Sequence, residues 1–377
     1  MNELIKKHVL SNGMVLLGQP MSHVESVSFC FLVPGGSALL PDGCCGVAPV
    51  LNDWIFRGAG RYNNRDLMDA LDSLGLHRQA GVSSEYLSYS VSLEAGNLFK
   101  ALELYADILL RPRLESEQFE FSRQLALHEL ASLEDDPRQK VMYHLYEEFY
   151  PDPLGRPPVG KEQDLRQLKA SLTQDLKTAL FDWSQVILGV AGKFVFDDVC
   201  SQVEALFSEA PAVQNQPHTL RFTPHEYLHI PNKGAQVHIG FMTEVPSFDS
   251  PAYYQIMAAV SVLSGGMSSR LFTEVREKRG LCYAVGARYH TLRKYAGISG
   301  YAGTTPDKAQ QTLEVTLSEF QRLRKGVTKD EINRARVGLK SSLIMQNEST
   351  HSRASRLTSD QFFLKRVRPL AYSLKVL

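Results

Sequence analysis

The sequence predicts an α+β protein of two homologous domains, each an antiparallel β-sheet with helices packed mainly on one face. Three observations support this prediction. The chain has 377 residues, more than one compact core usually holds. Both halves show the same order of elements, strands first and helices afterwards. Between them, residues 211–224 lack apolar periodicity and are rich in loop-favouring residues. We expect an N-terminal domain over residues 1–212, a linker over 213–225 and a C-terminal domain over 226–377.

Each half contains segments with the periodicity of strands and of amphipathic helices. In the N-terminal half we expect strands at residues 26–33 and 86–93, and helices at residues 47–56, 98–109 and 115–135. In the C-terminal half we expect strands at residues 236–242, 283–289 and 296–302, and helices at residues 250–262, 269–278, 306–324 and 329–345. Repetition of the order within one chain favours two related domains.

Composition excludes several classes of function. Lysine plus arginine equals aspartate plus glutamate at 41 each, so no overall charge attracts nucleic acid or an anionic membrane. The five cysteines show no C-x-x-C spacing, which favours a reducing compartment over a disulfide framework. Residues 1–20 are typical of two strands joined by a turn, and not of an export signal. No apolar stretch approaches the roughly 20 residues that span a bilayer. We therefore expect a cytoplasmic protein.

Residues 225–229 spell H-E-x-x-H, the pattern that places two histidines one helical turn apart around zinc. Pro224 and Pro231 leave about six residues between them, too few for a stable helix. In a strand, His225 and His229 would share one face while Glu226 points to the other. We favour an exposed strand; the alternative, a self-sufficient zinc peptidase, would require stoichiometric zinc in the isolated chain.

The helix expected near residues 46–58 has two distinct faces. Its apolar residues follow the i, i+3, i+4, i+7, i+8 pattern of a buried stripe: Val47, Val50, Leu51, Trp54 and Ile55. At about 100° per residue, Pro49, Asn52 and Asp53 fall together on the opposite face. That face is directed away from the core.

This segment resembles the site helix of the inverted zincins, the peptidase family of pitrilysin, insulinase and mitochondrial processing peptidase. In that family an H-x-x-E-H motif on this face binds zinc and supplies the general base. Here Pro49 stands at the first histidine, Asn52 at the glutamate and Asp53 at the second histidine. Glu129 follows at the spacing of the family's remaining glutamate ligand. The resemblance thus covers the helix but not its chemistry.

The resemblance implies that this chain holds no catalytic zinc. Asp53 and Glu129 would offer only two oxygen ligands, whereas catalytic zinc usually takes three protein ligands including histidine. The neutral amide of Asn52 cannot accept a proton from water. We expect no cofactor in this chain and no peptide hydrolysis by the chain alone.

Further segments resemble the same family: residues 153–160, residues 186–192 and the long signature at 263–283. In the signature, Arg276 and Tyr283 match an arginine and a tyrosine that assist bound substrate. A phenol donor can stabilise a developing oxyanion, and a guanidinium can orient it. The alternative is a solvated charge near a helix end and a strand aromatic. Gly265 and Gly266 are expected to contact substrate as a flexible loop, or simply to separate two helices.

A chain that keeps the substrate-side pair without metal ligands is typical of one subunit in a heterodimeric family member. The resemblance therefore implies a non-catalytic, substrate-binding subunit of a zinc metallopeptidase, paired with a homologous subunit that carries H-x-x-E-H and the zinc. Arg276 and Tyr283 would act in the partner's site on a peptide or unfolded polypeptide. The alternative is a purely structural interaction protein, like the core subunits of respiratory complexes that resemble the same family.

Overall fold

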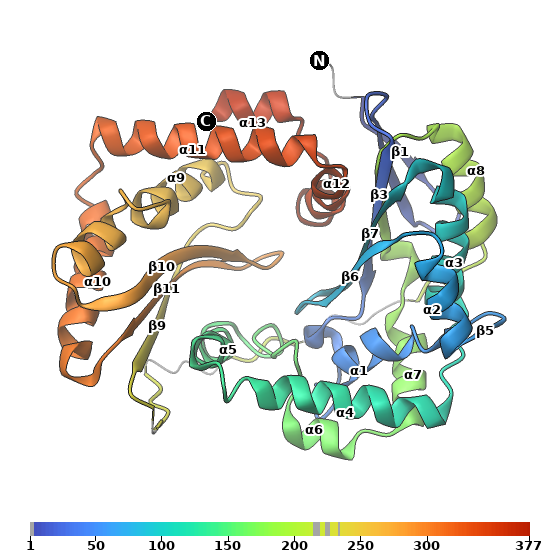
Figure 1. Ribbon diagram of the computed structural model, residues 1–377, viewed down its shortest axis with the longest axis horizontal. Helices are drawn as coiled ribbons and strands as arrows, with labels where there is room; N and C mark the ends of the chain where they lie inside the picture. Colours follow the sequence, from blue (N-terminus) through green and yellow to red (C-terminus); the bar gives the residue numbers. More distant parts are fainter. Residues whose placement is uncertain (1–3, 214–218, 223–226, 233) are drawn as a thin grey trace. The chain divides into compact units, whose positions relative to one another are not determined.

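The computed structural model describes residues 4–213, 219–222, 227–232 and 234–377, which form two compact units (Figure 1). Unit 1 comprises Met1–Ser132, Asp152–Arg221 and Gln346–Val367. Unit 2 comprises Leu133–Pro151, Phe222–Met345 and Arg368–Leu377. Much of the expected linker lies outside the described residues, so the boundary at 213–225 stays a prediction. Unit 1 therefore includes Gln346–Val367 from the C-terminal part of the sequence, and unit 2 includes Leu133–Pro151 from the N-terminal part.

Unit 1 is built on a six-stranded sheet with the order β1-β2-β8-β3-β7-β6. Its strands are β1 (Lys6–Val9), β2 (Val15–Pro20), β3 (Ser26–Pro34), β6 (His77–Val82), β7 (Tyr86–Glu94) and β8 (Ile187–Gly192). The β2–β8 pair is parallel, and the other described pairings are antiparallel. The sheet is therefore mixed, where the sequence predicted an antiparallel one. Parallel neighbours need a long crossover, which the helices between β2 and β8 supply.

Helices cover one face of this sheet and enclose the main core. The helices of unit 1 are α1 (Val47–Trp54), α2 (Asn64–Asp72), α3 (Leu98–Leu110), α4 (Ser116–Ser132), α6 (Glu162–Gln167), α7 (Ala170–Leu180), α8 (Phe196–Phe207) and α12 (Thr350–Leu364). Short elements are η1 (Ser37–Leu39), β4 (Gly58–Ala59), β5 (Tyr62–Asn63), η2 (Ala95–Asn97) and η3 (Trp183–Gln185). Alternate residues of β7 are buried, as the period-2 pattern predicted. Trp54, Tyr105, Phe29 and Phe207 are among the largest fully buried side chains of the core.

Helix α12 packs on the other face of the sheet. It approaches closely because Gly189 lacks a side chain: a Cβ there would lie 2.6 Å from the carbonyl oxygen of Ala354. Leu17, Leu32 and Leu357 form a second, smaller core at this contact. The helix that covers this face thus comes from the C-terminal part of the sequence.

Unit 2 contains a three-stranded antiparallel sheet with the order β10-β11-β9. Its strands are β9 (Val237–Glu244), β10 (Cys282–Thr291) and β11 (Ala296–Thr304). Its helices are α5 (Pro137–Phe149), α9 (Tyr253–Ser264), the π-helix η4 (Phe272–Glu277), the 3₁₀ helix η5 (Pro306–Lys308), α10 (Ala309–Leu323), most of α11 (Lys329–Glu348) and α13 (Leu370–Val376). Leu263, Leu271, Val275 and Ile298 lie in its core.

Helix α5 packs against β9, although it belongs to the first half of the sequence. The missing side chain of Gly240 leaves room for Val141, whose Cγ2 would lie 3.3 Å from a Cβ at that position. Beyond the end of α5, Tyr150 shares a 2.7 Å hydrogen bond between its hydroxyl and Nδ1 of His290. Tyr146 stacks on the same imidazole at 4.3 Å. Among the described residues, the six-stranded sheet therefore has α12 on its second face, and the three-stranded sheet has α5.

The α+β fold class and the main expected strands and helices are confirmed. Helix α1 spans Val47–Trp54 and α9 spans Tyr253–Ser264, close to the predicted ranges. Among the described residues, every helix is too short or too polar to cross a membrane. Of the H-E-x-x-H sequence, His225 and Glu226 lie outside the described residues; residues 227–232 are described and have no regular secondary structure.

Candidate functional site

The helix α1 has the two faces that the sequence predicted. Its apolar stripe is at most 1 % exposed. Pro49, Asn52 and Asp53 are half-buried on the other side of the helix. The sequence therefore predicted the orientation of these three residues correctly, and their contacts decide what this face can do.

The carboxylate of Asp53 is held by two donors. Ser122 of α4 donates its hydroxyl hydrogen to Oδ2 at 2.5 Å, and Nε of Arg57 donates to the same oxygen at 2.5 Å. The Arg57 guanidinium also lies 5.9 Å from the ring centroid of Phe121. Asp53 is thus part of a bonded contact between α1 and α4.

Asn52 has a buried side-chain oxygen without a hydrogen-bond partner in the described part of the chain. An unsatisfied buried acceptor of this kind costs about 1–3 kcal/mol. Glu129 is exposed on α4, two turns beyond the Ser122 that contacts Asp53. The structure therefore gives these two positions different surroundings.

These residues do not fit zinc. Proline offers no side-chain lone pair at position 49, Asp53 already accepts two hydrogen bonds, and the amide of Asn52 is a weak ligand for zinc. Among the described residues, no three His, Cys, Asp or Glu side chains are grouped so that they could hold a metal ion. The face that matches the family's zinc site here forms a contact between helices.

Arg276 and Tyr283 lie together in unit 2. The guanidinium carbon of Arg276 is 5.2 Å from the ring centroid of Tyr283 and 4.9 Å from that of Phe272. Such distances are typical of a cation–π contact. Tyr283 is 80 % exposed, and Arg276 is exposed as well. The pair is therefore available to a molecule outside the chain.

Both residues stand on irregular backbone. Arg276 belongs to η4, where the N–H of Lys278 donates to the carbonyl of Thr273 at 2.9 Å. The sequence predicted an ordinary short helix here, and the structure has a π-helix. Tyr283 occupies a β-bulge, because the register of β10 on β11 shifts between Cys282 and Ala284. Bulges redirect side chains, and π-helices are frequent at functional sites.

Gly265 and Gly266 form an exposed turn after α9. A Cβ on Gly265 would lie 2.5 Å from the carbonyl oxygen of Ser261, and Gly266 has a φ of +153°. Both positions need glycine for backbone reasons, which supports their role in ending the helix. Their role in substrate binding stays a prediction.

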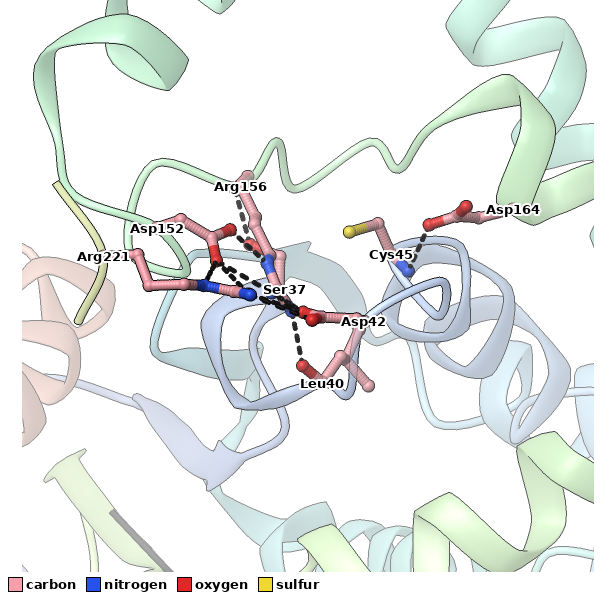
Figure 2. A network of polar contacts seen from close by, with 8 residues as sticks. All are labelled: Ser37, Leu40, Asp42, Cys45, Asp152, Arg156, Asp164 and Arg221. Carbon is pink, nitrogen blue, oxygen red and sulfur yellow. Dashed lines mark hydrogen bonds and ion pairs between the residues drawn. The ribbon is translucent and has the colours of Figure 1, made fainter. Parts of the chain in front are cut away.

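A network of charged side chains, which the sequence did not predict as a unit, surrounds Arg156 in unit 1 (Figure 2). The Arg156 guanidinium donates to Asp152 Oδ1 at 2.7 Å, to the Leu40 carbonyl at 2.6 Å and to Asp42. Arg221 donates to Asp152 Oδ2 at 2.6 Å and to Asp42 Oδ1 at 2.9 Å. These side chains fasten the loop after α5 to the segment before α1.

The hydrogen bonds of the network also lower the pKa values of its two carboxyl groups. Hydrogen bonds from Arg221 and then Arg156 hold the pKa of Asp42 below its usual range. A hydrogen bond from Arg156, followed by one from Arg221, does the same to the pKa of Asp152. The only advance signal for the network was the segment 153–160, which contains Arg156. Asp152 is four residues away, but Leu40, Asp42 and Arg221 are distant in the sequence, so no local pattern connects the whole network.

Two surface grooves are lined by other residues. A groove of about 390 Å³ lies between α9 and β10 in unit 2, lined by Phe248, Tyr253, Met257, Val260, Ala287, Arg288, Tyr289 and Thr291. A second groove of about 310 Å³ lies beside the Arg156 network in unit 1. The residues that the sequence singled out as a site line neither groove.

Fold and site together define a class of protein: an α+β peptidase-like chain that keeps the arginine–tyrosine pair and lacks a set of residues fit for zinc. Two family models match it. Residues 19–161 match "Insulinase (Peptidase family M16)", and residues 179–339 match "Peptidase M16 inactive domain". The chain belongs to the M16 peptidase family, which confirms the resemblance read from the sequence.

Relatives and solved structures agree with this assignment. An uncharacterized zinc protease of Rickettsia bellii is 28 % identical over 92 % of this chain and 85 % of that protein. The uncharacterized zinc protease YmxG of Bacillus subtilis is 26 % identical over 97 % and 90 %, respectively. An M16 inactive domain from Pseudomonas fluorescens has a TM-score of 0.88 and 18 % identity over 99 % of this chain and 90 % of that one. A chain of complex III2 from Candida albicans has a TM-score of 0.85 and 16 % identity over 99 % and 89 %. The structural matches show the fold.

Proposed function

We propose that this chain is the non-catalytic, substrate-binding subunit of a heterodimeric zinc metallopeptidase. Its partner is a homologous subunit that carries H-x-x-E-H and the zinc ion. Arg276 and Tyr283 of this chain enter the partner's site, where a peptide or unfolded polypeptide is hydrolysed. The observation that carries the proposal is the exposed arginine–tyrosine pair in a chain whose own zinc face is a helix contact.

The geometry of the pair supports this role. A phenol hydrogen can be donated to the oxygen of a scissile carbonyl as negative charge develops there. A guanidinium over the ring stays positively charged at every relevant pH. It can therefore stabilise the negative charge that develops on the carbonyl oxygen without a proton transfer. Both side chains reach solvent, and a partner or a substrate could cover them.

The rest of the proposal follows from the residues around the pair. Gly265 and Gly266 lack side chains in an exposed turn, so the backbone of an extended peptide could approach closely. Zinc belongs to the partner alone. We also place the protein in the cytoplasm, because its five cysteines are unpaired among the described residues.

The test is peptide hydrolysis by this chain co-expressed with an H-x-x-E-H homologue. Tyr283→Phe should lower kcat by roughly 10²–10³-fold, the usual effect of losing one oxyanion donor. Arg276→Ala should lower it as well. The matched controls are Tyr372→Phe and Arg288→Ala, which change an exposed tyrosine and an exposed arginine elsewhere in unit 2.

Unchanged turnover in both Tyr283→Phe and Arg276→Ala would remove the proposed role. That result would favour the alternative of a purely structural protein of the same fold. Metal analysis of the isolated chain adds an independent check, since one tightly bound zinc per chain would contradict the assignment of zinc to the partner.

A further inference from the structure

Arg270 lies at the start of the segment that carries Arg276, six residues before it, and its side chain is only 5 % exposed. Nε donates to Glu331 Oε1 at 2.6 Å, and Nη2 donates to Oε2 at 2.8 Å. Nη2 also donates to the carbonyl of Gly326 at 3.0 Å. The guanidinium and the carboxylate therefore form a bidentate pair, which fixes their relative orientation.

Glu331 is itself fixed by bonds that do not involve Arg270. Its Oε2 accepts the backbone N–H of Thr328 at 2.8 Å, and its own N–H donates to Oγ1 of Thr328 at 3.2 Å. This reciprocal pair is the capping box at the start of α11. The hydrogen bond from Arg270 is the main cause that lowers the pKa of Glu331 to about 2. The pair is thus an anchor between the loop after α9 and the first turn of α11.

The anchored segment has a backbone that needs outside support. The π-helix is rare and is found mostly as single turns inside other structure. Leu271 and Val275 are fully buried, and the N–H of Leu281 donates to the carbonyl of Val275 at 3.0 Å. These contacts hold the buried side of η4. In an α-helix each residue advances about 100°, so a change of one residue in phase would turn Arg276 away from Tyr283.

A contribution to stability alone does not explain the Arg270–Glu331 ion pair well. Desolvation offsets most of the attraction in a buried ion pair, and the best-attested use of such pairs is to fix one register. In addition, Nη1 of Arg270 is buried without a hydrogen-bond partner in the described residues. An unsatisfied donor lowers the net stabilisation further. The arrangement is therefore better suited to fixing geometry than to stabilising the fold.

We propose that Arg270, through its bidentate pair with Glu331, is a positioning residue that holds η4 in the register at which Arg276 stacks on Tyr283. Arg270 touches neither of them, and its effect passes through the backbone of η4. The inference rests on the proposed function of Arg276 and Tyr283 and extends it to the residues that set the geometry of these two side chains.

The first experiment is a double-mutant cycle on turnover by the co-expressed subunits. Arg270→Lys keeps the charge but loses the bidentate geometry, and Glu331→Gln keeps the size of the carboxylate. Each should lower kcat by about tenfold to a hundredfold, with KM little changed, as expected for a small misplacement of reacting groups. In the Tyr283→Phe background the same changes should lower kcat less than twofold.

A matched control separates positioning from loss of stability. Ala335→Gly weakens α11 at its buried position without touching the ion pair, and it should leave kcat unchanged. If Arg270→Lys lowers kcat by the same factor with and without Tyr283, the positioning role is wrong. If Tyr283→Phe and Arg276→Ala both leave turnover unchanged, the proposed function fails, and the NMR measurement on the isolated chain then decides the role of Arg270.

The second experiment needs no partner. In the isolated chain, the rings of Tyr283 and Phe272 should both shift the Arg276 side-chain NMR signals upfield, and Tyr283→Leu should remove the part of the shift that Tyr283 contributes. Arg270→Lys and Glu331→Gln should reduce it, while Ala335→Gly should not. An unchanged upfield shift in folded Arg270→Lys and Glu331→Gln would overturn the inference even if the pair proves catalytic.

Discussion

Arg156→Met should destabilise unit 1 far more than a change to its neighbour Arg221. The Arg156 side chain is 8 % exposed, and its guanidinium bonds Asp152, Asp42 and the carbonyl of Leu40 (Figure 2). Methionine keeps the apolar stem and removes the charge and its donors. Leu40 is fully buried, so its carbonyl would lose this donor where water has little access.

The magnitude follows from these losses. An unsatisfied buried acceptor costs about 1–3 kcal/mol, and a hydrogen bond to a charged group contributes about 1.5–3 kcal/mol. The second figure must be reduced, because Asp152 is partly exposed and keeps its bond to Arg221. We expect a loss of about 3 kcal/mol, at the lower end for breaking a buried ion pair. For a domain of 150–250 residues this lowers Tm by roughly 6–12 °C.

Differential scanning calorimetry is the suitable assay, because two compact units can unfold in separate transitions. Arg221→Met is the control: it removes an arginine of the same network that is 58 % exposed, and its Tm should stay close to the wild-type value. Equal shifts in the two variants would refute the reasoning. So would a shift below roughly 2 °C for Arg156→Met.

Two pH effects should accompany these results. The pKa values of Asp42 and Asp152 are lowered, so their contribution is present above about pH 4 and is lost as the pH falls through the lowered pKa values. The Tm difference between wild type and Arg156→Met should therefore narrow below pH 4; a constant difference down to pH 2 would contradict this. In unit 2, burial lowers the pKa of His290 to about 4. The unfolded chain then binds a proton near pH 6.5 that the folded chain does not, so unit 2 should lose stability between about pH 6.5 and 4. His290→Gln should make the free energy of unfolding, measured by urea titration, less dependent on pH between about pH 6.5 and 4. An unchanged dependence on pH would argue against this role of His290.

Local patterns were sufficient for the main elements that the sequence analysis named and for the orientation of α1. The apolar spacing of Val47 to Ile55 correctly placed Pro49, Asn52 and Asp53 on the other face. The same spacing could not say what that face contacts. Ser122 lies far along the chain from Asp53, and only the packing of α1 on α4 brings its hydroxyl to the carboxylate.

The placing of two helices was beyond a local pattern. The sequence analysis predicted neither α5 nor α12, and the apolar periodicity of a helix does not show which sheet it packs against. The information lies in distant small residues: Gly240 leaves room for α5, and Gly189 leaves room for α12. A glycine in a strand signals a close approach without naming the partner. The parallel β2–β8 pair was missed for a similar reason, because alternation in a strand does not encode the direction of its neighbour.

For the site, the match to the family signature singled out Arg276 and Tyr283, and the structure places the guanidinium beside the ring. The match to the signature did not predict the π-helix or the bulge on which these two residues lie. Both features depend on hydrogen bonds and buried contacts outside the segment. Among these is the Arg270–Glu331 pair, whose members are separated by two further helices and two strands.

Asp53 on α1 and the Arg276–Tyr283 pair differ in their contacts within the fold. Asp53 is bonded to Arg57 and Ser122, so this side chain already has a role inside unit 1. Tyr283 buries little of its surface, and a bulge and a π-helix, both departures from regular backbone, hold it against Arg276. Packing would explain a buried tyrosine on a regular strand; it does not explain an exposed one at an irregular position. Among the described residues, neither burial nor a hydrogen bond accounts for the exposed position of Tyr283, which supports the proposal that the pair acts on a molecule outside the chain.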